Sequence, residues 1–566
     1  VLGIFAFEIL LFVIMRNRLP LRIFLFVALN CLCLFSLSGQ TQKMIRPMQR
    51  PVILSGNFGE LRATHFHSGI DIKTGGVTGI PVVCVKDGLI ARVRVSPVGY
   101  GNALYVEHGD GTTTVYGHLE RFAPCIERLV RELQYSREDF GLDEDFRAYA
   151  LLFKQGDTIA YSGNSGSSGG PHLHFEIRDT RTEKVLNPLS VYKIRDAIPP
   201  LVKTVYIYSI SEEGCVESVK EISVKSSGAG RYSVGQVTVP AGKIGIGVHA
   251  EDRMNDSGNK LGVYKMDLTV AGDTLFRLKM DSCDFGESCY INTIKDFYRY
   301  KKRETVYRCF GWFQNNVTGV ENFDGGVFEI QQDSSLALQL DLWDINGNRA
   351  KVNLTLKGGR EREQVISPDS VLRFDCAYQF FLPEWELELK PGMLPWSVKQ
   401  EIGIEADSNG GGETLVLSRE EVPLMKKAVL SFIGKYGEKA LICEEDAQGR
   451  LYALETRREE DRLSAAIGYL SRYRVVEDTV PPTVTFLGIT SGRRVSFKIK
   501  DDLSGIGQYR GEVNGEWCLF VYDAKNDLFS CSLNEPVFKA GETHLVKVRV
   551  CDRAGNCNER IVNVKK

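Results

Sequence analysis

The sequence predicts a mainly β protein, built from a small antiparallel β-domain with a helical insertion and from β-sandwich modules that follow it. Two observations carry this prediction. Short runs of strand-like residues, separated by Gly- and Pro-rich turns, recur along most of the 566 residues. Four of the later runs form two hairpin-like units, each around a D-x-x-G-N turn. A chain of this length is expected to hold about three or four domains, each able to bury its own core.

The first domain contains a succession of short strands. Residues 89–95 and 103–108 read as strands on either side of a loop that contains Pro97 and two glycines. Gly109-Asp110-Gly111 is a tight turn, from which residues 112–116 return as a third strand. Such short strands with Gly-rich turns are typical of a small antiparallel β-domain.

A helical insertion interrupts this domain at about residues 122–155. Pro124 can open a helix, and apolar residues recur at helical spacing over residues 126–133. A second helix is expected at residues 143–153, before strand character resumes at residue 158. The insertion either forms one wall of a cleft or is a solvated surface excursion.

Two similar hairpins indicate sandwich-type modules in the rest of the chain. Residues 545–551 alternate as a half-buried strand, enter the turn Asp552–Asn556 and return as a second strand. A similar turn at residues 344–348 lies between residues 336–342 and 352–356. The acidic residues of these turns, and Asp501-Asp502, either bind calcium or only shape the turns.

Proline pairs mark the expected domain limits. Pro199-Pro200 follows the first domain, and Pro481-Pro482 precedes the last hairpin-bearing segment. The expected organisation is a signal region at 1–39, the first β-domain at 44–195, a β-sandwich module at 200–358, a mixed β module at 359–479 and an immunoglobulin-like β-sandwich at 480–566.

The N-terminal segment has the layout of a signal peptide. A basic stretch begins near Met15, which is the expected true start, and an apolar run over residues 23–37 ends at small residues 38–40. The alternative is a membrane anchor, because residues 1–14 are also apolar apart from Glu8. The layout predicts an exported protein of the periplasm or cell envelope.

Cysteine number and net charge limit the class of protein further. Twelve of the 14 cysteines follow residue 39, and an even number in an exported protein is compatible with disulfides. Cys283 with Cys289 and Cys551 with Cys557 share one spacing, and the alternative for all of them is free buried thiols. A formal net charge of -2 argues against a nucleic-acid partner.

Six of the eight histidines lie between His65 and His174, which indicates a metal site. Residues two apart on a strand project from the same face, so His172 and His174 are expected to point into one groove. His67 and Asp71 are four apart, and Gly69 between them lets the backbone bend so that both side chains converge. Histidine with carboxylate suits a hydrolytic zinc site.

These residues suggest a division of roles. His67, Asp71 and His174 supply three metal ligands and leave a fourth position open. His172 accepts a proton from water and passes it to a leaving amine, and His118 hydrogen-bonds a developing oxyanion.

Two neighbouring histidines are given other roles. His65 is either a competing ligand or a neighbour that lines the groove, and we expect the second. His108 lies in strand-like sequence and is expected to be structural.

The motifs HSGIDI, YGHL, SGNSGSSGGPHLHFEIR and NPL, in this order, resemble the M23 family of zinc metallopeptidases, the lysostaphin- and LytM-type peptidoglycan endopeptidases. The resemblance covers roughly residues 50–190. It implies an antiparallel β metallopeptidase domain, one Zn²⁺ per chain on His67, Asp71 and His174, and catalytic His118 and His172. It also implies the peptide cross-links of bacterial peptidoglycan as substrate. The insertion after His118 departs from the family pattern.

The sequence therefore predicts an exported zinc metalloendopeptidase that hydrolyses peptide cross-links of peptidoglycan. One alternative is a non-catalytic scaffold or activator of another cell-wall hydrolase, whose β-sandwich modules dock envelope protein partners. Another is a wall-binding protein with a vestigial metal domain. The presence of all five site residues favours the enzyme.

Overall fold

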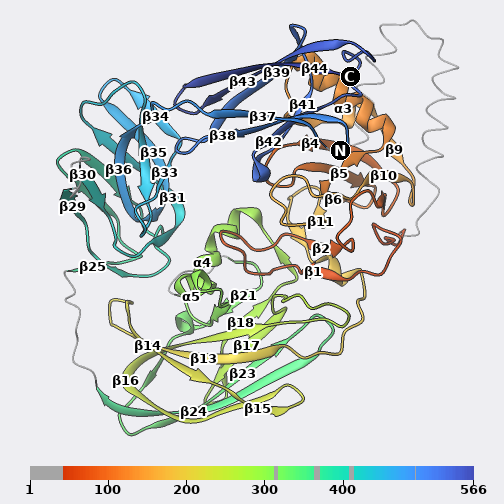
Figure 1. Cartoon of the computed structure of the whole chain (residues 1–566). Coiled ribbons are helices and arrows are strands. Elements are labelled where there is room, and N and C mark those ends of the chain that lie inside the picture. The colour runs from red at the N-terminus through yellow and green to blue at the C-terminus, as the bar shows by residue number, and fades with distance from the viewer. Residues whose placement is uncertain (1–41, 312–316, 362–369, 407–412, 491) are drawn as a thin grey trace, which may run out of the picture. The chain divides into compact units, whose positions relative to one another are not determined.

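Most of the described chain is β-strand, arranged in sheets that succeed one another along the sequence (Figure 1). The computed structural model describes residues 42–311, 317–361, 370–406, 413–490 and 492–566. The predicted signal region, residues 1–39, lies outside these residues. The predicted mainly β fold is confirmed.

The first sheet is antiparallel and carries the histidines. Its strands, in order of pairing, are β1 (Leu54–Gly56), β2 (Ile70–Lys73), β11 (His172–Asp179), β6 (Thr112–Leu119), β5 (Asn102–His108), β4 (Gly88–Val95) and β8 (Leu142–Asp145). Three short strands extend it: β9 (Leu152–Phe153) on β4, β12 (Val185–Leu186) on β11, and β19 (Ser282–Cys283) on β12. A separate small sheet contains β3 (Pro81–Val83), β10 (Thr158–Tyr161) and β7 (Arg121–Phe122). The strands expected at residues 89–95, 103–108 and 112–116 are all present.

The predicted insertion contains one α-helix rather than two. Helix α3 (Pro124–Arg137) begins with a proline in its first turn, buries Ile126 and Val130, and ends at Glu138 in the left-handed conformation. The prediction of a second helix at residues 143–153 is wrong. That segment forms β8, the short 3₁₀ helix η1 (Arg147–Tyr149) and β9.

Sheet pairing explains this difference. Strand β8 pairs antiparallel with β4, and β9 pairs with the other end of β4. Arg92 of β4 also binds Asp143 of β8 through two nitrogen–oxygen contacts of 2.6 Å. Backbone hydrogen bonds to an otherwise unpaired strand edge outweigh a weak local preference for helix.

A large sheet follows the first domain. Its main path is β14 (Val216–Ser223), β13 (Leu201–Ile210), β16 (Arg231–Glu251), β24 (Arg349–Glu361), β23 (Ser335–Trp343), β17 (Lys265–Val270), β18 (Asp273–Lys279) and β21 (Val320–Asn322). Three strands pair with the long β16 from outside this path: β15 (Lys225–Gly228), β20 (Val306–Arg308) and β22 (Phe328–Ile330). The pairing of β16 with β24 is parallel, and the others are antiparallel. The short helices η3 (Phe285–Tyr290), α4 (Ile291–Ile294) and α5 (Phe297–Lys301) lie between β19 and β20 in the chain.

The next segment forms two five-stranded sheets around a shared apolar core. One sheet contains β26 (Tyr378–Phe381), β27 (Trp385–Leu389), β31 (Val422–Ile433), β35 (Arg462–Leu470) and β34 (Thr456–Glu459). The other contains β29 (Gly403–Ala406), β30 (Glu413–Val416), β36 (Arg472–Glu477), β32 (Ala440–Glu445) and β33 (Leu451–Ala453). β25 (Val371–Leu372) pairs with β28 (Val398–Lys399). Trp385, Leu430, Ile442 and Tyr473 belong to the core that both larger sheets supply.

The last segment forms two four-stranded sheets that also share one core. One contains β37 (Thr483–Thr490), β38 (Arg494–Lys500), β42 (Leu528–Ser532) and β41 (Phe520–Asp523). The other contains β40 (Glu516–Trp517), β39 (Ile506–Val513), β43 (Thr543–Asp552) and β44 (Cys557–Lys565). Alternate residues of these strands, such as Phe497, Phe529 and Val548, are buried together.

The two hairpins expected from the D-x-x-G-N turns are confirmed. Strands β23 and β24 flank the first turn, and β43 and β44 flank the second. Cys551 and Cys557 are joined by a disulfide across the second hairpin, whereas Cys283 and Cys289 are free thiols. The spacing shared by the two cysteine pairs is therefore not sufficient to predict a bond, because only one pair lies directly opposite across a hairpin.

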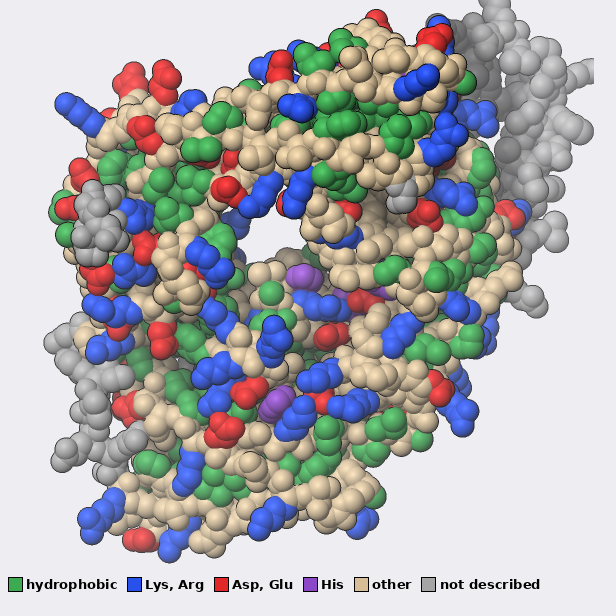
Figure 2. All heavy atoms as spheres, viewed as in Figure 1, with side chains coloured by type: hydrophobic (Ala, Val, Ile, Leu, Met, Phe, Trp, Pro, Cys, Tyr) green, Lys and Arg blue, Asp and Glu red, His purple; other side chains and the backbone are tan. Residues whose placement is uncertain are grey.

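Residues 46–566 form one compact unit, and the domain limits within it stay a prediction. Lys and Arg side chains are interspersed with Asp and Glu over the face shown in Figure 2, in keeping with a net charge near zero. Among the residues that the structure describes, no helix has the length and apolar character needed to cross a bilayer.

Leu173 links the stability of the first sheet to its histidines. It is fully buried on β11, between His172 and His174. We expect Leu173→Ala to lower the opening free energy of β11 by about 2–5 kcal/mol, because the substitution removes buried methyl groups and leaves a cavity. Leu152→Ala, at a side chain that is 77% exposed, should change it by less than about 0.5 kcal/mol. Native-state hydrogen exchange of the β11 amides measures both, and equal effects would contradict this packing.

Candidate active site

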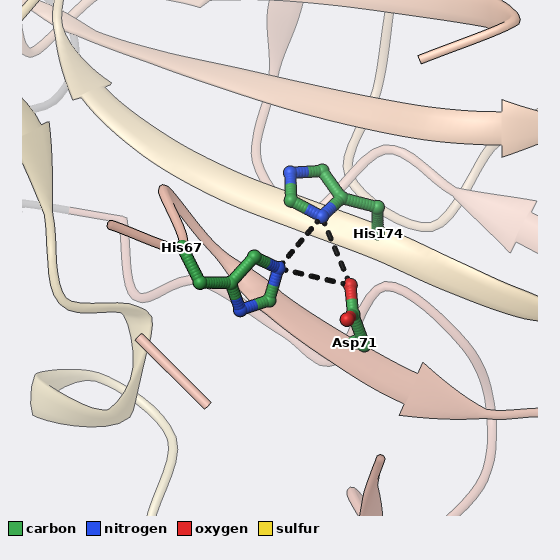
Figure 3. A group of neighbouring side chains, drawn as sticks. All are labelled: His67, Asp71 and His174. Atoms are coloured by element: carbon green, nitrogen blue, oxygen red, sulfur yellow. Dashed lines mark hydrogen bonds and ion pairs between the residues drawn. The ribbon is translucent and has the colours of Figure 1, made fainter. Parts of the chain in front are cut away.

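Three side chains from separate segments converge at the end of the first sheet. His67 precedes β2, Asp71 lies within β2, and His174 lies on β11, directly opposite Asp71 in the strand register. His67 Nε2 is 3.1 Å from Asp71 Oδ1 and 3.2 Å from His174 Nδ1, and His174 Nδ1 is 3.0 Å from Asp71 Oδ1. Figure 3 shows the three side chains pointing toward one another. All three are buried.

His67 Nε2, Asp71 Oδ1 and His174 Nδ1 form a triangle with the dimensions of one face of a tetrahedral zinc coordination shell. Ligand bonds of about 2.1 Å in tetrahedral geometry place neighbouring ligand atoms about 3.4 Å apart. The three observed distances of 3.0–3.2 Å come close to this value. Two imidazoles and one carboxylate also match the donor set of catalytic zinc. The residues present therefore fit a metal ion.

Hydrogen bonds on the outer side of each imidazole fix which nitrogen faces the centre. His67 Nδ1 donates to the backbone oxygen of Asn57 at 2.7 Å, so its Nε2 presents a lone pair inward. His174 Nε2 donates to Glu176 Oε1 at 2.8 Å, so the neutral form of the ring presents the lone pair of Nδ1 inward. Such outer partners set the tautomer and raise the basicity of a ligating histidine.

Glu176 is an outer partner that the motifs did not identify. It is fully buried and also accepts hydrogen bonds from Ser68 Oγ at 2.5 Å and Tyr100 Oη at 2.6 Å. Arg178 Nε donates to its other oxygen at 2.7 Å. Burial alone would raise the pKa of Glu176, but His174, Arg178 and these hydrogen bonds lower it to about 2. The only signal in the sequence was alternation, because residues 172, 174 and 176 share one face of a strand.

Asp71 is held as an anion by its neighbours. Burial by itself raises the pKa of its carboxyl group, but the surrounding histidines hold the pKa well below its usual range. Arg62 Nη2 donates to Asp71 Oδ2 at 3.0 Å, which leaves Oδ1 directed at the histidines.

The pKa of His174 is shifted upward by its neighbours. Burial lowers the pKa of His174, but hydrogen bonds to Asp71 and Glu176 outweigh it and raise the pKa to about 9.

Gly69 allows β2 to approach β11 closely enough for this arrangement. A Cβ atom at this position would lie 2.4 Å from the backbone oxygen of Phe175 and 3.1 Å from His174 Cε1. Any larger residue would push the two strands apart at the point where Asp71 and His174 meet. The role expected for Gly69 thus concerns close backbone approach rather than an unusual backbone angle.

His118 and His172 lie beside the triangle. His172 Nε2 is 3.3 Å from Asp71 Oδ1, and the ring centres of His118 and His172 are 4.8 Å apart. His118 Nδ1 donates to the backbone oxygen of Ser165 at 2.9 Å, and His172 Nδ1 donates to that of Gly170 at 2.8 Å. In both rings Nε2 is therefore the atom that can accept a proton.

His118 is also set apart by its backbone and its pKa. It adopts a positive φ of 58°, which none of the other histidines at this site does. Burial and the nearby His174 and His172 lower its pKa to about 3, so the ring is neutral. A neutral ring with Nδ1–H bound to Ser165 has no proton on Nε2. It can donate to an oxyanion only after it has accepted a proton.

The two remaining histidines of this region lie outside the triangle. His65 is exposed and contacts Thr64 Oγ1. His108 is buried between the backbone oxygen of Asp87 and Thr114 Oγ1, at 3.0 and 2.8 Å. The convergent metal-type group of this sheet consists of His67, Asp71 and His174 alone among the described residues.

A buried His–Asp–His group beside two further histidines on an antiparallel sheet is the kind of site that metallopeptidases use. Residues 65–132 match the model of Peptidase family M23. The resemblance to the M23 family inferred from the motifs is confirmed for this segment. A metallopeptidase domain implies a metal ion, generally zinc.

Several curated proteins are similar over the same part of the chain. An uncharacterized metalloprotease of Haemophilus influenzae is 30% identical over 154 residues, 26% of each chain. The DD-carboxypeptidase/endopeptidase Mpg of Neisseria meningitidis is 30% identical over 131 residues, 23% of this chain and 24% of that one. The peptidoglycan DD-endopeptidase ShyB of Vibrio cholerae is 34% identical over 111 residues, 20% of each chain. The matched stretch thus spans about a quarter or less of these relatives' length.

Among solved structures, the catalytic domain of lysostaphin from Staphylococcus simulans is similar. It is 22% identical, and the match covers 25% of this chain and 90% of that one, with a TM-score of 0.19.

Replacement of Glu176 tests its role behind His174. We expect Glu176→Gln to weaken zinc binding by about 10- to 100-fold, because the neutral amide no longer supports the basicity of His174. Glu183→Gln is the matched control, since Glu183 also binds Arg178, at 2.9 Å, but from an exposed side chain. Competition with a chromogenic chelator gives both affinities. Equal zinc affinity in the two variants would contradict the role of Glu176.

Protons should compete with a metal at His174. With a pKa of about 9, His174 is protonated at neutral pH and must release that proton before it can bind a metal. The apparent zinc affinity should therefore fall about tenfold for each pH unit below 9. Calorimetry in buffers of different ionisation enthalpy should find about one proton released per zinc at pH 7. Zinc affinity that does not change between pH 6 and 8 would contradict this assignment.

Proposed function

We propose that the chain is an exported zinc metalloendopeptidase that hydrolyses peptide cross-links of bacterial peptidoglycan. The observation that carries this proposal is the convergence of five side chains at the end of one sheet. His67, Asp71 and His174 supply the metal ligands, and His118 and His172 lie beside them with their Nε2 atoms able to accept protons. The match to Peptidase family M23 over residues 65–132 supports the class of reaction.

One zinc ion per chain is the expected cofactor. When bound, zinc activates a water molecule and polarises the carbonyl group of the scissile bond. The protein's part is to hold the ligands in a buried site of fixed geometry. Asn57, Glu176 and Arg62 orient the three ligands from outside, so that each directs one atom at the same point.

Proton transfer falls to the two imidazole rings beside the ligands. His172 Nε2 lies 3.3 Å from Asp71 Oδ1 and is positioned to accept a proton from water and to return it to the leaving amine. His118, which rests without a proton on Nε2, assists in the same way or stabilises the oxyanion once it has accepted a proton. The role expected for His118 from the sequence, donation to the oxyanion, thus requires an earlier proton transfer.

The substrate is inferred from the relatives. ShyB is named a peptidoglycan DD-endopeptidase and Mpg a DD-carboxypeptidase/endopeptidase. An enzyme that acts on peptidoglycan must reach the cell envelope, which agrees with the signal-like N-terminal segment. We place the peptidase domain at residues 44–195, and the modules at 200–358, 359–479 and 480–566 are available to bind envelope protein partners.

Digestion of purified, cross-linked peptidoglycan tests this function. The zinc-loaded chain should release products with new free termini at the cross-bridge, read by mass spectrometry. His172→Ala should keep its zinc and lose about 10²- to 10⁴-fold in rate, because the proton acceptor is removed while the ligands stay. His67→Ala should lose both zinc and cleavage.

His65→Ala is the control, since His65 is exposed and lies outside the ligand group. It should retain its zinc. Zinc-loaded protein that leaves peptidoglycan intact, but stimulates a second hydrolase, would replace this proposal with the activator alternative.

A further inference from the structure

A second group of acidic side chains, separate in its residues from the histidine site, lies at strand ends of the large sheet. Asp196 precedes β13, Asp252 directly follows β16, and Asp344 opens the turn between β23 and β24. One carboxylate oxygen from each lies within 4.8 Å of the others. Segments far apart in the chain thus bring three carboxylates to one point.

Two of these carboxylates are buried, and one of them is incompletely bonded. Asp252 is only 5% exposed and Asp344 only 2%. Asp252 Oδ1 is buried without a hydrogen-bond partner. An unpartnered carboxylate oxygen in a protein interior is costly, because it loses its water without compensation.

The nearby basic side chains are engaged elsewhere. Lys203, Arg253 and Lys260 all bind Glu251, at 2.8, 2.8 and 3.2 Å. Burial and the charge of Asp344 raise the pKa of Asp252 to about 8. Burial also raises the pKa of Asp344, to about 6. Mutual repulsion among the carboxylates is therefore not relieved by the neighbouring cations.

The D-x-x-G-N turn holds the carboxylates in place. Asn348 donates from its backbone nitrogen to Asp344 Oδ1 at 2.7 Å and from its side chain to Asp344 Oδ2 at 2.6 Å. The same side-chain nitrogen reaches the backbone oxygen of Asp196 at 3.3 Å. The asparagine thereby fixes the turn and the segment leading into β13 around the same point.

We propose that Asp196, Asp252 and Asp344 form a calcium site. Three carboxylates offer oxygen ligands only, which suits a hard divalent cation and not zinc, which favours nitrogen and sulfur. Calcium accepts six to eight oxygen ligands in flexible geometry, whereas magnesium keeps most of its water. The ion would bind the segment before β13 to β16 and to the β23–β24 turn.

A second convergent group of three aspartates lies in the last segment of the chain and differs from the first in its surroundings. Asp478, Asp501 and Asp552 also converge, and Asn556 bonds Asp552 and the backbone of Asp478 as Asn348 does in the first group. There, however, the Lys439 ammonium group contacts the side-chain oxygen of Asn556. In addition, no carboxylate oxygen of the second group is buried without a hydrogen-bond partner, unlike Asp252 Oδ1 in the first.

Calcium titration of the full chain tests the site. Equilibrium dialysis with radioactive calcium should show that Asp252→Asn loses one bound equivalent relative to the wild type. Asp552→Asn, at the corresponding position of the second group, should keep that equivalent. Excess magnesium should not displace it.

Thermal unfolding provides a second measurement that a misfolded variant cannot imitate. Saturating calcium should raise the melting temperature of the wild type by roughly 5 °C and leave that of Asp252→Asn unchanged. Without calcium, Asp252→Asn should melt at about the same temperature as the wild type at neutral pH, because the raised pKa of Asp252 already leaves its carboxyl group largely uncharged there. Equal calcium binding by wild type and Asp252→Asn, or no binding by either, would overturn the proposal.

Discussion

The register of three strands is the constraint on which the peptidase site depends. β11 lies between β2 and β6, so that His174 faces Asp71 on one side and Gly117 on the other. A shift of one residue would turn both histidines of β11 to the opposite face of the sheet. Gly69 keeps β2 close to β11 where the ligands meet. The site geometry is thus a property of the sheet and not of the histidines alone.

Electrostatics in the buried interior complete the site. Glu176 stays ionised without solvent because Arg178, Ser68 and Tyr100 bind it, and it in turn orients His174. Arg178 and Arg62 pair with Glu176 and Asp71, and both carboxylates also hydrogen-bond His174. Against the effect of burial, those hydrogen bonds raise the pKa of His174 to about 9, so a proton competes with a metal ion for this ring.

The acidic group on the large sheet also gathers carboxylates in the protein interior, but its donor atoms are different. Negative side chains are brought together by the fold and are not neutralised by the basic residues beside them. In the histidine site the donors are nitrogen and oxygen, which suits zinc, whereas the aspartate site offers oxygen alone. The donor atoms of the two groups therefore suit different ions, and the groups use separate residues.

The sequence by itself determined the mainly β class, the two D-x-x-G-N hairpins and the strand that carries His172 and His174, because alternation and turn residues are local signals. It overpredicted helix at residues 143–153, where pairing with β4 decided the outcome. Only the tertiary structure showed Glu176 behind His174 and brought Asp196, Asp252 and Asp344 together. Alternation places Glu176 on the same strand face as His174 but does not show which groups bind it. The three aspartates are far apart in the chain and leave no periodic signal in it, so the folded protein alone reveals their contact.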